Sequence, residues 1–181
     1  MARISQGRGY SLTELLVTVL VLAILVSLAV PAIKDALARQ RGRGAVEGLR
    51  ATLQWGRSEA MKQNVPVFFS ILPSAPWCVG LSRGLGCGCG VACPDPAALL
   101  TETFGVGFPG VSVASASFAG SLCGSVECVR FEPQRGTAQG SNGTVVLESA
   151  VGARYRIIVA GLGRVRVCVE QGDAGAPWPH C

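Results

Sequence analysis

The chain has 181 residues, the length of one ordinary domain, and a net charge of +5 from 16 basic and 11 acidic residues. Hydrophobic residues make up 49% of it and charged residues only 15%, which excludes a disordered chain because there is ample apolar material to bury. The only histidine, His180, is next to the C-terminus, which argues against a histidine-based active site.

A single long apolar run occupies residues 15–33, which are 19 positions without a charge. At 1.5 Å per residue a helix of this length spans roughly 29 Å, about one bilayer core. Arg3 and Arg8 precede the run and no acid occurs before Glu14, a bias that keeps the N-terminus cytoplasmic and exports the rest. Val30-Pro31-Ala32 is a poor signal-cleavage site, so we expect the run to be retained. One such run excludes a polytopic membrane protein.

The residues around Glu14 form a specific motif. They read Gly9-Tyr10-Ser11-Leu12-Thr13-Glu14-Leu15-Leu16-Val17, and this segment resembles the prepilin cleavage motif of type IV pilins and type II secretion pseudopilins. The resemblance implies that prepilin peptidase cuts between Gly9 and Tyr10 and that the new N-terminal amine is methylated. It also implies that Glu14 neutralises the N-terminal amine of a neighbouring subunit during assembly. Tyr10 stands where phenylalanine is usual in the family.

The helical pattern continues beyond the apolar run to about Gln63, and Pro66 marks its end. One face carries apolar residues at spacings of 3, 4 and 7, namely Val46, Leu49, Leu53 and Ala60. A basic stripe lies beside that face, because about 100° per residue brings four arginines within roughly 40° of one another. They are Arg39, Arg43, Arg50 and Arg57. The stripe is either a solvated helix flank or a surface for polyanions or acidic neighbouring subunits.

The chain beyond residue 64 has the pattern of short strands separated by glycine-rich turns, which predicts a small antiparallel β-sandwich packed on the helix. The expected strands are residues 65–72, 111–118, 128–132, 144–148, 155–160 and 164–170. Residues 74–100 match no strand or helix pattern and are predicted to form an insertion or long loop that holds four cysteines.

Two further segments resemble the FimT/GspH branch of minor pilins and pseudopilins. They are Arg57-Ser58-Glu59-Ala60-Met61-Lys62 and the turn Phe131-Glu132-Pro133-Gln134-Arg135-Gly136. The implied class is α+β, a long N-terminal pilin helix with a membrane-spanning first half, packed on a small antiparallel β-sandwich. The expected parts are a leader (1–9), a transmembrane and assembly half-helix (10–33), an amphipathic half-helix (34–63) and a β-rich globular domain (64–181) with a Cys-rich loop (74–100).

Eight cysteines in an exported domain favour disulfides, although the sequence does not settle their connectivity. We expect Cys168–Cys181 to tie the C-terminal tail to the last strand, and Cys123–Cys128 to close a hairpin. The remaining four, Cys78, Cys87, Cys89 and Cys93, then pair among themselves. The competing interpretation is a metal site, but C-x-C-x₃-C is not a typical zinc spacing, and we expect no metal and no cofactor.

The segment Gly163-Arg164-Val165-Arg166 places two arginines on one face of a strand, about 6–7 Å apart. Arg154 and Arg156 repeat the spacing one hairpin earlier. Guanidinium groups suit phosphate oxygens, and contacts to the nucleic-acid backbone alone carry no sequence preference. The alternative is an exposed strand face whose arginines discourage edge pairing. Gly163-Arg164-x-Arg166 resembles the GRxR motif of FimT-type minor pilins, which implies DNA binding, and the Cys168 and Cys181 pair resembles their bridged tail.

Two functions follow. The first is a minor pilin of a type IV pilus that binds the DNA phosphate backbone for uptake in natural transformation, anchored in the inner membrane with a periplasmic globular domain before it joins other pilins at the cell surface. The second is a structural minor pilin that primes assembly, or a GspH-like secretion pseudopilin. No catalytic motif such as G-x-S-x-G, a P-loop or H-E-x-x-H is present in the sequence. We therefore expect that the protein is not an enzyme.

Overall fold

The computed structural model describes residues 11–83, 87–89, 92–93, 95–120, 123, 126–138 and 140–181. The chain divides into two compact units, Met1–Leu37 and Ala38–Cys181. In the described part of the first unit, the helix α1 (Leu12–Gln63) exposes its apolar residues. By length and composition, α1 can cross a membrane. It continues into the second unit, which holds the buried core.

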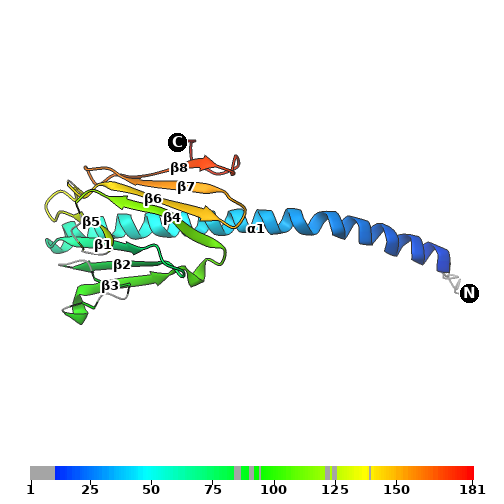
Figure 1. The fold of residues 1–181 in the computed structure, drawn as a ribbon, viewed down its shortest axis with the longest axis horizontal. Helices are drawn as coiled ribbons and strands as arrows, with labels where there is room; N and C mark the ends of the chain where they lie inside the picture. The colour runs from blue at the N-terminus through cyan, green and yellow to red at the C-terminus, as the bar shows by residue number, and fades with distance from the viewer. Residues whose placement is uncertain are drawn as a thin grey trace, which may run out of the picture. The chain divides into compact units, whose positions relative to one another are not determined.

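The strands form two antiparallel four-stranded sheets (Figure 1). The first sheet has the order β3-β2-β1-β5 and the second the order β4-β6-β7-β8. The strand bounds are β1 (Val67–Leu72), β2 (Cys78–Arg83), β3 (Leu99–Phe104), β4 (Val111–Phe118), β5 (Glu127–Phe131), β6 (Gly143–Ser149), β7 (Arg154–Val159) and β8 (Val165–Gln171). The predicted α+β class, with a long apolar helix on antiparallel sheets, is confirmed.

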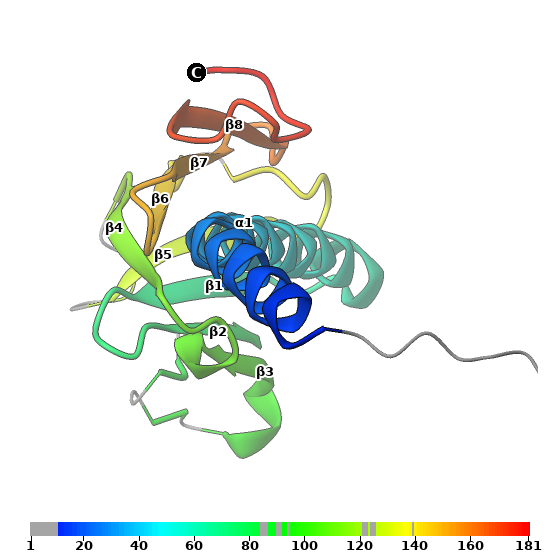
Figure 2. The same ribbon diagram turned by 90° about the vertical axis from the view of Figure 1, so that its right-hand side faces the viewer.

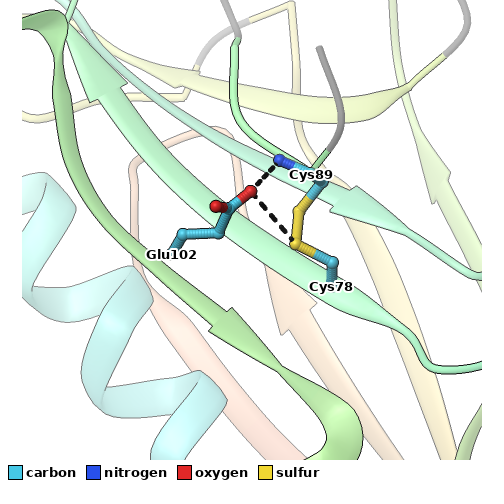
Figure 3. Close-up of side chains that lie close together, drawn as sticks. All are labelled: Cys78, Cys89 and Glu102. Carbon is cyan, nitrogen blue, oxygen red and sulfur yellow. Dashed lines mark hydrogen bonds between the residues drawn. A yellow bond between two sulfur atoms is a disulfide. The ribbon is translucent and has the colours of Figure 1, made fainter. Parts of the chain in front are cut away.

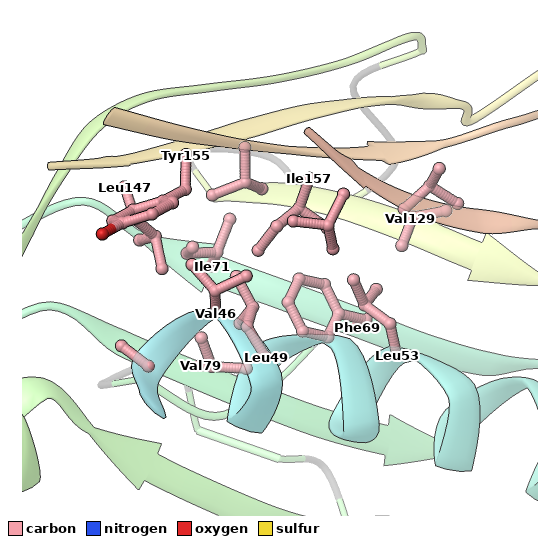
Figure 4. Packing of buried hydrophobic residues seen from close by; sticks show 14 of the residues in the cluster. Val46, Leu49, Leu53, Phe69, Ile71, Val79, Val129, Leu147, Tyr155 and Ile157 are labelled. Carbon is pink, nitrogen blue, oxygen red and sulfur yellow. The ribbon is translucent and has the colours of Figure 1, made fainter. Parts of the chain in front are cut away.

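The second unit has one hydrophobic core, to which α1 and both sheets contribute (Figure 4). In Figure 2, which looks along the helix, the strands of both sheets lie round the part of α1 that belongs to this unit. The predicted apolar face of the helix is buried there and meets side chains such as Phe69 of the first sheet and Ile157 of the second. The regular apolar spacing on α1 therefore marks the side that the sheets cover.

Two helix glycines allow the sheets to approach the helix closely. A Cβ at Gly42 would lie 2.9 Å from Cε2 of Tyr155, and one at Gly56 would lie 2.5 Å from Cδ1 of Leu81. Both distances are too short for carbon atoms in contact, which favour about 3.5–4.0 Å. The glycines cost intrinsic helix stability, and in exchange each opens room for a large side chain from one of the two sheets.

The prediction of a loop over residues 74–100 is wrong for two of its parts, because β2 lies within it and β3 begins at its end. β2 is buried along nearly its whole length, so it lacks the alternation of apolar and polar residues that marks a half-exposed strand. Its Gly80 resembles turn punctuation in the sequence. In the structure, a Cβ at Gly80 would come within 3.0 Å of the Cys87 carbonyl oxygen, so glycine is the residue that fits there.

Candidate functional site

The β7–β8 hairpin carries all four arginines that the sequence pairs by spacing. β7 and β8 are antiparallel, with Arg156 opposite Cys168 and Ile158 opposite Arg166. Buried and more exposed residues alternate along β7, so Tyr155 and Ile157 face the core while Arg156 is exposed. A tight turn joins the strands, in which Gly163 N–H donates to the Ala160 carbonyl at 2.7 Å.

Arg154 and Arg156 have carboxylate partners on neighbouring strands. Arg154 Nε donates to Glu148 Oε2 at 2.8 Å, and Arg156 Nε donates to Glu170 Oε1 at 2.5 Å. These glutamates come from β6 and β8, on either side of β7. The positive charge of both arginines is therefore compensated within the sheet itself.

Arg164 and Arg166 are both exposed, and they differ from that pair because neither forms an ion pair within the described part of the chain. Arg164 lies one residue before β8 (Val165–Gln171), whereas the sequence predicts a strand that begins at Arg164. Together with Ala160, Leu162 and Arg57 of α1, they line a hollow of about 380 Å³. Three arginines thus line one open hollow beside the hairpin turn.

Gly163 holds the turn against a second loop. Its backbone has φ +74°, a left-handed conformation that favours glycine, and a Cβ there would come within 1.9 Å of the Gly136 carbonyl oxygen. The same oxygen accepts a hydrogen bond from Arg57 Nε at 3.0 Å. Gly136 ends the turn that resembles the FimT/GspH pattern, and its N–H donates to the Glu132 carbonyl at 2.8 Å. The glycine of the GRxR motif therefore has a packing role in this chain.

Arg57 is a residue of this site that the sequence places elsewhere, in the basic stripe of the helix. The structure separates the stripe into different surroundings. Arg43 binds Asp173, Arg50 lies 3.6 Å from Glu47, and Arg57 lines the hollow beside the hairpin turn. Helical spacing alone gives a common face but does not show which loops or acids reach each position.

Arg43 forms a partly buried network with the segment after β8. Its Nε donates to Asp173 Oδ2 at 2.7 Å and its Nη2 lies 2.5 Å from Oδ1, while the Tyr155 hydroxyl donates to Oδ2 at 2.6 Å. The hydrogen bond from Arg43 is the main reason that the pKa of the Asp173 carboxyl lies below its usual value. Burial, followed by the bond to Asp173, raises the pKa of the Tyr155 hydroxyl. The network fastens the C-terminal segment to the helix.

All eight cysteines lie among the described residues and are joined in disulfides. The structure contains Cys168–Cys181 and Cys123–Cys128, the two pairs that the sequence favours, and Cys78–Cys89 and Cys87–Cys93 among the remaining four.

The carboxylate of Glu102 lies beside the Cys78–Cys89 disulfide (Figure 3). Its Oε1 accepts a hydrogen bond from the Cys89 N–H and lies 3.5 Å from Cys78 Sγ. A disulfide sulfur carries no proton and is not a thiolate, the form of cysteine that binds metals. This group of three residues therefore explains how the Cys-rich segment is fastened to β3, and it offers no thiolate ligand while the disulfide is intact.

The expected processing and assembly residues lie at the start of the chain. Glu14 is exposed in the first turn of α1. Gly9 and Tyr10, which flank the expected cleavage site, lie outside the described residues, as does the expected leader over residues 1–9.

Comparison with known proteins gives one family. A family model described as type II transport protein GspH matches residues 45–163, a range that includes α1 from residue 45 onward, the strands from β1 to β7 and the turn with Gly163. No curated protein and no solved structure matches the chain.

Proposed function

Because the chain belongs to the GspH family of type II transport proteins, we propose that it is a minor pilin that binds DNA without sequence preference through Arg164 and Arg166. The family, a structural rather than an enzymatic one, suggests a minor pilin or pseudopilin, and the apolar half of α1 suggests membrane anchoring and pilus assembly. In this role the bound DNA is taken up in natural transformation.

One observation supports the DNA-binding part: Arg164 and Arg166 are exposed beside a hollow that, within the part of the chain the structure describes, has no acid in its lining. Arg154 and Arg156 share their spacing but are engaged by Glu148 and Glu170. Guanidinium groups without an internal carboxylate are available for phosphate oxygens, which they bind in a bidentate fashion. Of the four arginines that the sequence offers for DNA, we therefore expect Arg164 and Arg166 to supply the main phosphate contacts and Arg154 and Arg156 to contribute little.

The proposal for assembly follows the same family. Prepilin peptidase cuts between Gly9 and Tyr10, the new N-terminus is methylated, and the inner membrane holds the helix with the globular unit in the periplasm. Glu14 then pairs with the N-terminal amine of a neighbouring pilin when the subunit enters the filament. An exposed carboxylate at the start of an apolar helix supports this role, because a charge inside a membrane needs a partner.

A second candidate is a pseudopilin of a type II secretion system, and the description of the matching family favours it. In that case the free arginines contact acidic side chains of neighbouring subunits rather than DNA. The two candidates share the fold and the anchoring, and they differ in the ligand of the hairpin turn.

The deciding experiment is a DNA titration of the full chain in non-ionic detergent at several salt concentrations. We expect the parent to bind unrelated sequences equally and the Arg164→Ala, Arg166→Ala variant to lose most of this affinity, with a log–log salt slope lower by about 2. The matched control is Arg154→Ala, Arg156→Ala, which removes the same charge from the same hairpin and should bind almost as the parent does. If the two double variants bind alike, or if the parent does not bind, the DNA proposal is rejected and the secretion or assembly function takes its place.

A further inference from the structure

We propose that Arg57 of α1 is a third phosphate-binding residue of the hollow, so that neighbouring phosphates of a nucleic-acid backbone are held between the helix and the hairpin turn. The identity of the ligand as DNA rests on the proposed function, whereas the phosphate chemistry of the hollow does not. The juxtaposition that carries this inference is the lining of the hollow by Arg57, Arg164 and Arg166.

Arg57 is held in place by its own hydrogen bond. Its Nε donates to the carbonyl of Gly136 at 3.0 Å, and that carbonyl lies against Gly163 of the hairpin turn. Within the described residues no ion pair engages its guanidinium group. The Nε edge of the guanidinium group is thus fixed by the backbone, and its Nη groups remain available to a ligand. Because the side chain is already held in place, it loses little conformational entropy when an anion binds.

The charges around the hollow favour an anion from outside the chain. Arg57 is half-buried, and among the described residues those that line the hollow include three arginines and no acid. Like charges that converge in a partly desolvated place repel one another, and an oxyanion relieves this repulsion while it accepts several hydrogen bonds. Ala160 and Leu162 complete the lining, and Leu162 is 78% exposed, so an apolar surface lies beside the proposed phosphate position and suits a sugar ring.

A second basic hollow of the unit shows the contrast. It has a volume of about 530 Å³, and its lining includes Arg39, Arg43 and His180. That hollow also contains Asp173, which accepts two hydrogen bonds from Arg43. The charge of Arg43 is thus compensated from within the chain, so this hollow favours an external phosphate less than the hollow at the hairpin turn does.

The test uses the full chain in non-ionic detergent with two probes, inorganic pyrophosphate and long duplex DNA. Three variants are compared with the parent. Arg57→Gln removes the charge, Arg57→Lys keeps the charge but loses the fork, and Arg41→Gln is the matched control. Arg41 is exposed on the same helix, and its 16-residue separation from Arg57 corresponds to roughly 24 Å along the axis. Melting curves of all variants establish that each one folds.

We expect Arg57→Gln to bind both probes about tenfold more weakly and to lower the salt slope for DNA by about 1. Arg57→Lys should restore that slope while it recovers only part of the affinity, because a point charge replaces a fork. Arg41→Gln should match the parent. A purely structural role for Arg57 would leave the salt slope unchanged in every folded variant, and this result would overturn the inference.

The outcomes also separate this inference from the proposed function. If DNA binding requires Arg164 and Arg166 but not Arg57, the function stands and the inference is wrong. If pyrophosphate binds in an Arg57-dependent way but DNA does not bind, the phosphate hollow stands and the DNA function is rejected. If the parent binds neither probe, both are rejected.

Discussion

The two ends of the β7–β8 hairpin present arginines with the same spacing in opposite electrostatic conditions. At the open end, Arg154 and Arg156 are bound by glutamates of adjacent strands, and the chain runs on to Asp173, which binds Arg43. At the turn, Arg164 and Arg166 line a hollow together with a third arginine, and no acid lines it among the residues that the structure describes. Charges at the open end hold elements of the fold together, whereas those at the turn are available to a ligand.

The largest expected effect on stability comes from breaking the partly buried ion pair between Arg43 and Asp173 at the open end. Asp173 is 4% exposed, so Asp173→Asn leaves Arg43 without its counter-charge and should lower the free energy of unfolding by about 3 kcal/mol. The control is Glu47→Gln, which removes a half-exposed acid that lies 3.6 Å from Arg50 and should cost less than about 0.5 kcal/mol. Urea unfolding of both variants measures the difference, and equal losses would contradict this view of the open end.

The same network predicts a pH dependence. The pKa of Asp173 is lowered in the folded state, mainly by its hydrogen bond with Arg43, so its contribution is complete above the unfolded value of about 3.9 and is lost as the pH falls through the folded pKa. The pKa of Tyr155 is raised, first by burial, so its contribution is complete below about pH 10 and is lost as the pH rises further. The melting temperature of the parent should therefore decrease as the pH is lowered below about 4. In Asp173→Asn this decrease should be smaller.

At the turn, the next largest effect should come from Gly163→Ala. The substitution strains a left-handed backbone and places a Cβ against the Gly136 carbonyl, at a cost of about 2–3 kcal/mol. Gly161→Ala is the control in the same turn, since a Cβ there meets nothing within 4 Å, and it should change the free energy of unfolding by less than about 0.5 kcal/mol. Similar melting curves for the two variants would show that the turn is not braced by Gly136.

A smaller effect, on DNA affinity, should follow if the arginines at the open end lose their glutamate partners and so resemble those at the turn. Glu148→Gln with Glu170→Gln releases Arg154 and Arg156 from their partners, so we expect DNA affinity at low salt to rise by up to about tenfold, with a steeper salt slope. The control, Glu47→Gln with Asp95→Asn, changes the net charge equally at exposed positions away from the hairpin. An equal rise in both variants would indicate an effect of net charge rather than of local release.

The smallest effect is expected when Arg154 and Arg156 themselves are replaced by Ala. Both arginines are partly exposed, with 43% and 44% of their side-chain surface accessible, and such ion pairs each contribute about 1 kcal/mol or less. Urea unfolding should thus show a loss well below that of Asp173→Asn. A loss as large as that of Asp173→Asn would mean that the outer face of the sheet is as important for stability as the buried pair.

The sequence predicts the faces of the hairpin but not the partners on them. A period of two places Arg154 with Arg156 and Arg164 with Arg166, and the structure keeps both pairs on the hairpin. Whether a glutamate reaches them depends on the register between β6, β7 and β8, which the turns between these consecutive strands set. The spacing of the arginines within one strand does not specify that register.

The same limit applies to the parts of the fold that differ from the prediction. The apolar spacing of Val46, Leu49 and Leu53 identifies the buried side of α1 because a helix repeats locally. β2 is not predicted from the sequence because it is buried on both faces and therefore lacks the alternation of apolar and polar residues. The sequence assigns Arg57 to the basic stripe of the helix. Its place beside the hairpin turn depends on the Gly136 carbonyl, which contacts both Arg57 and Gly163, and no local sequence pattern predicts this tertiary contact.

The contact among Gly136, Gly163 and Arg57 also has a mechanical consequence. β8 is an edge strand of the sheet beside β7, and the C-terminal tail hydrogen-bonds to its outer side only at Val169 among the described residues. Tension applied at Arg164 and Arg166 by a long polymer would therefore tend to peel β8 from the sheet, beginning at the turn. The turn instead rests on the Gly136 carbonyl, which is tied to α1 through Arg57. A pull at the proposed ligand site is thus passed directly to the helix and does not have to travel through the strand ladder.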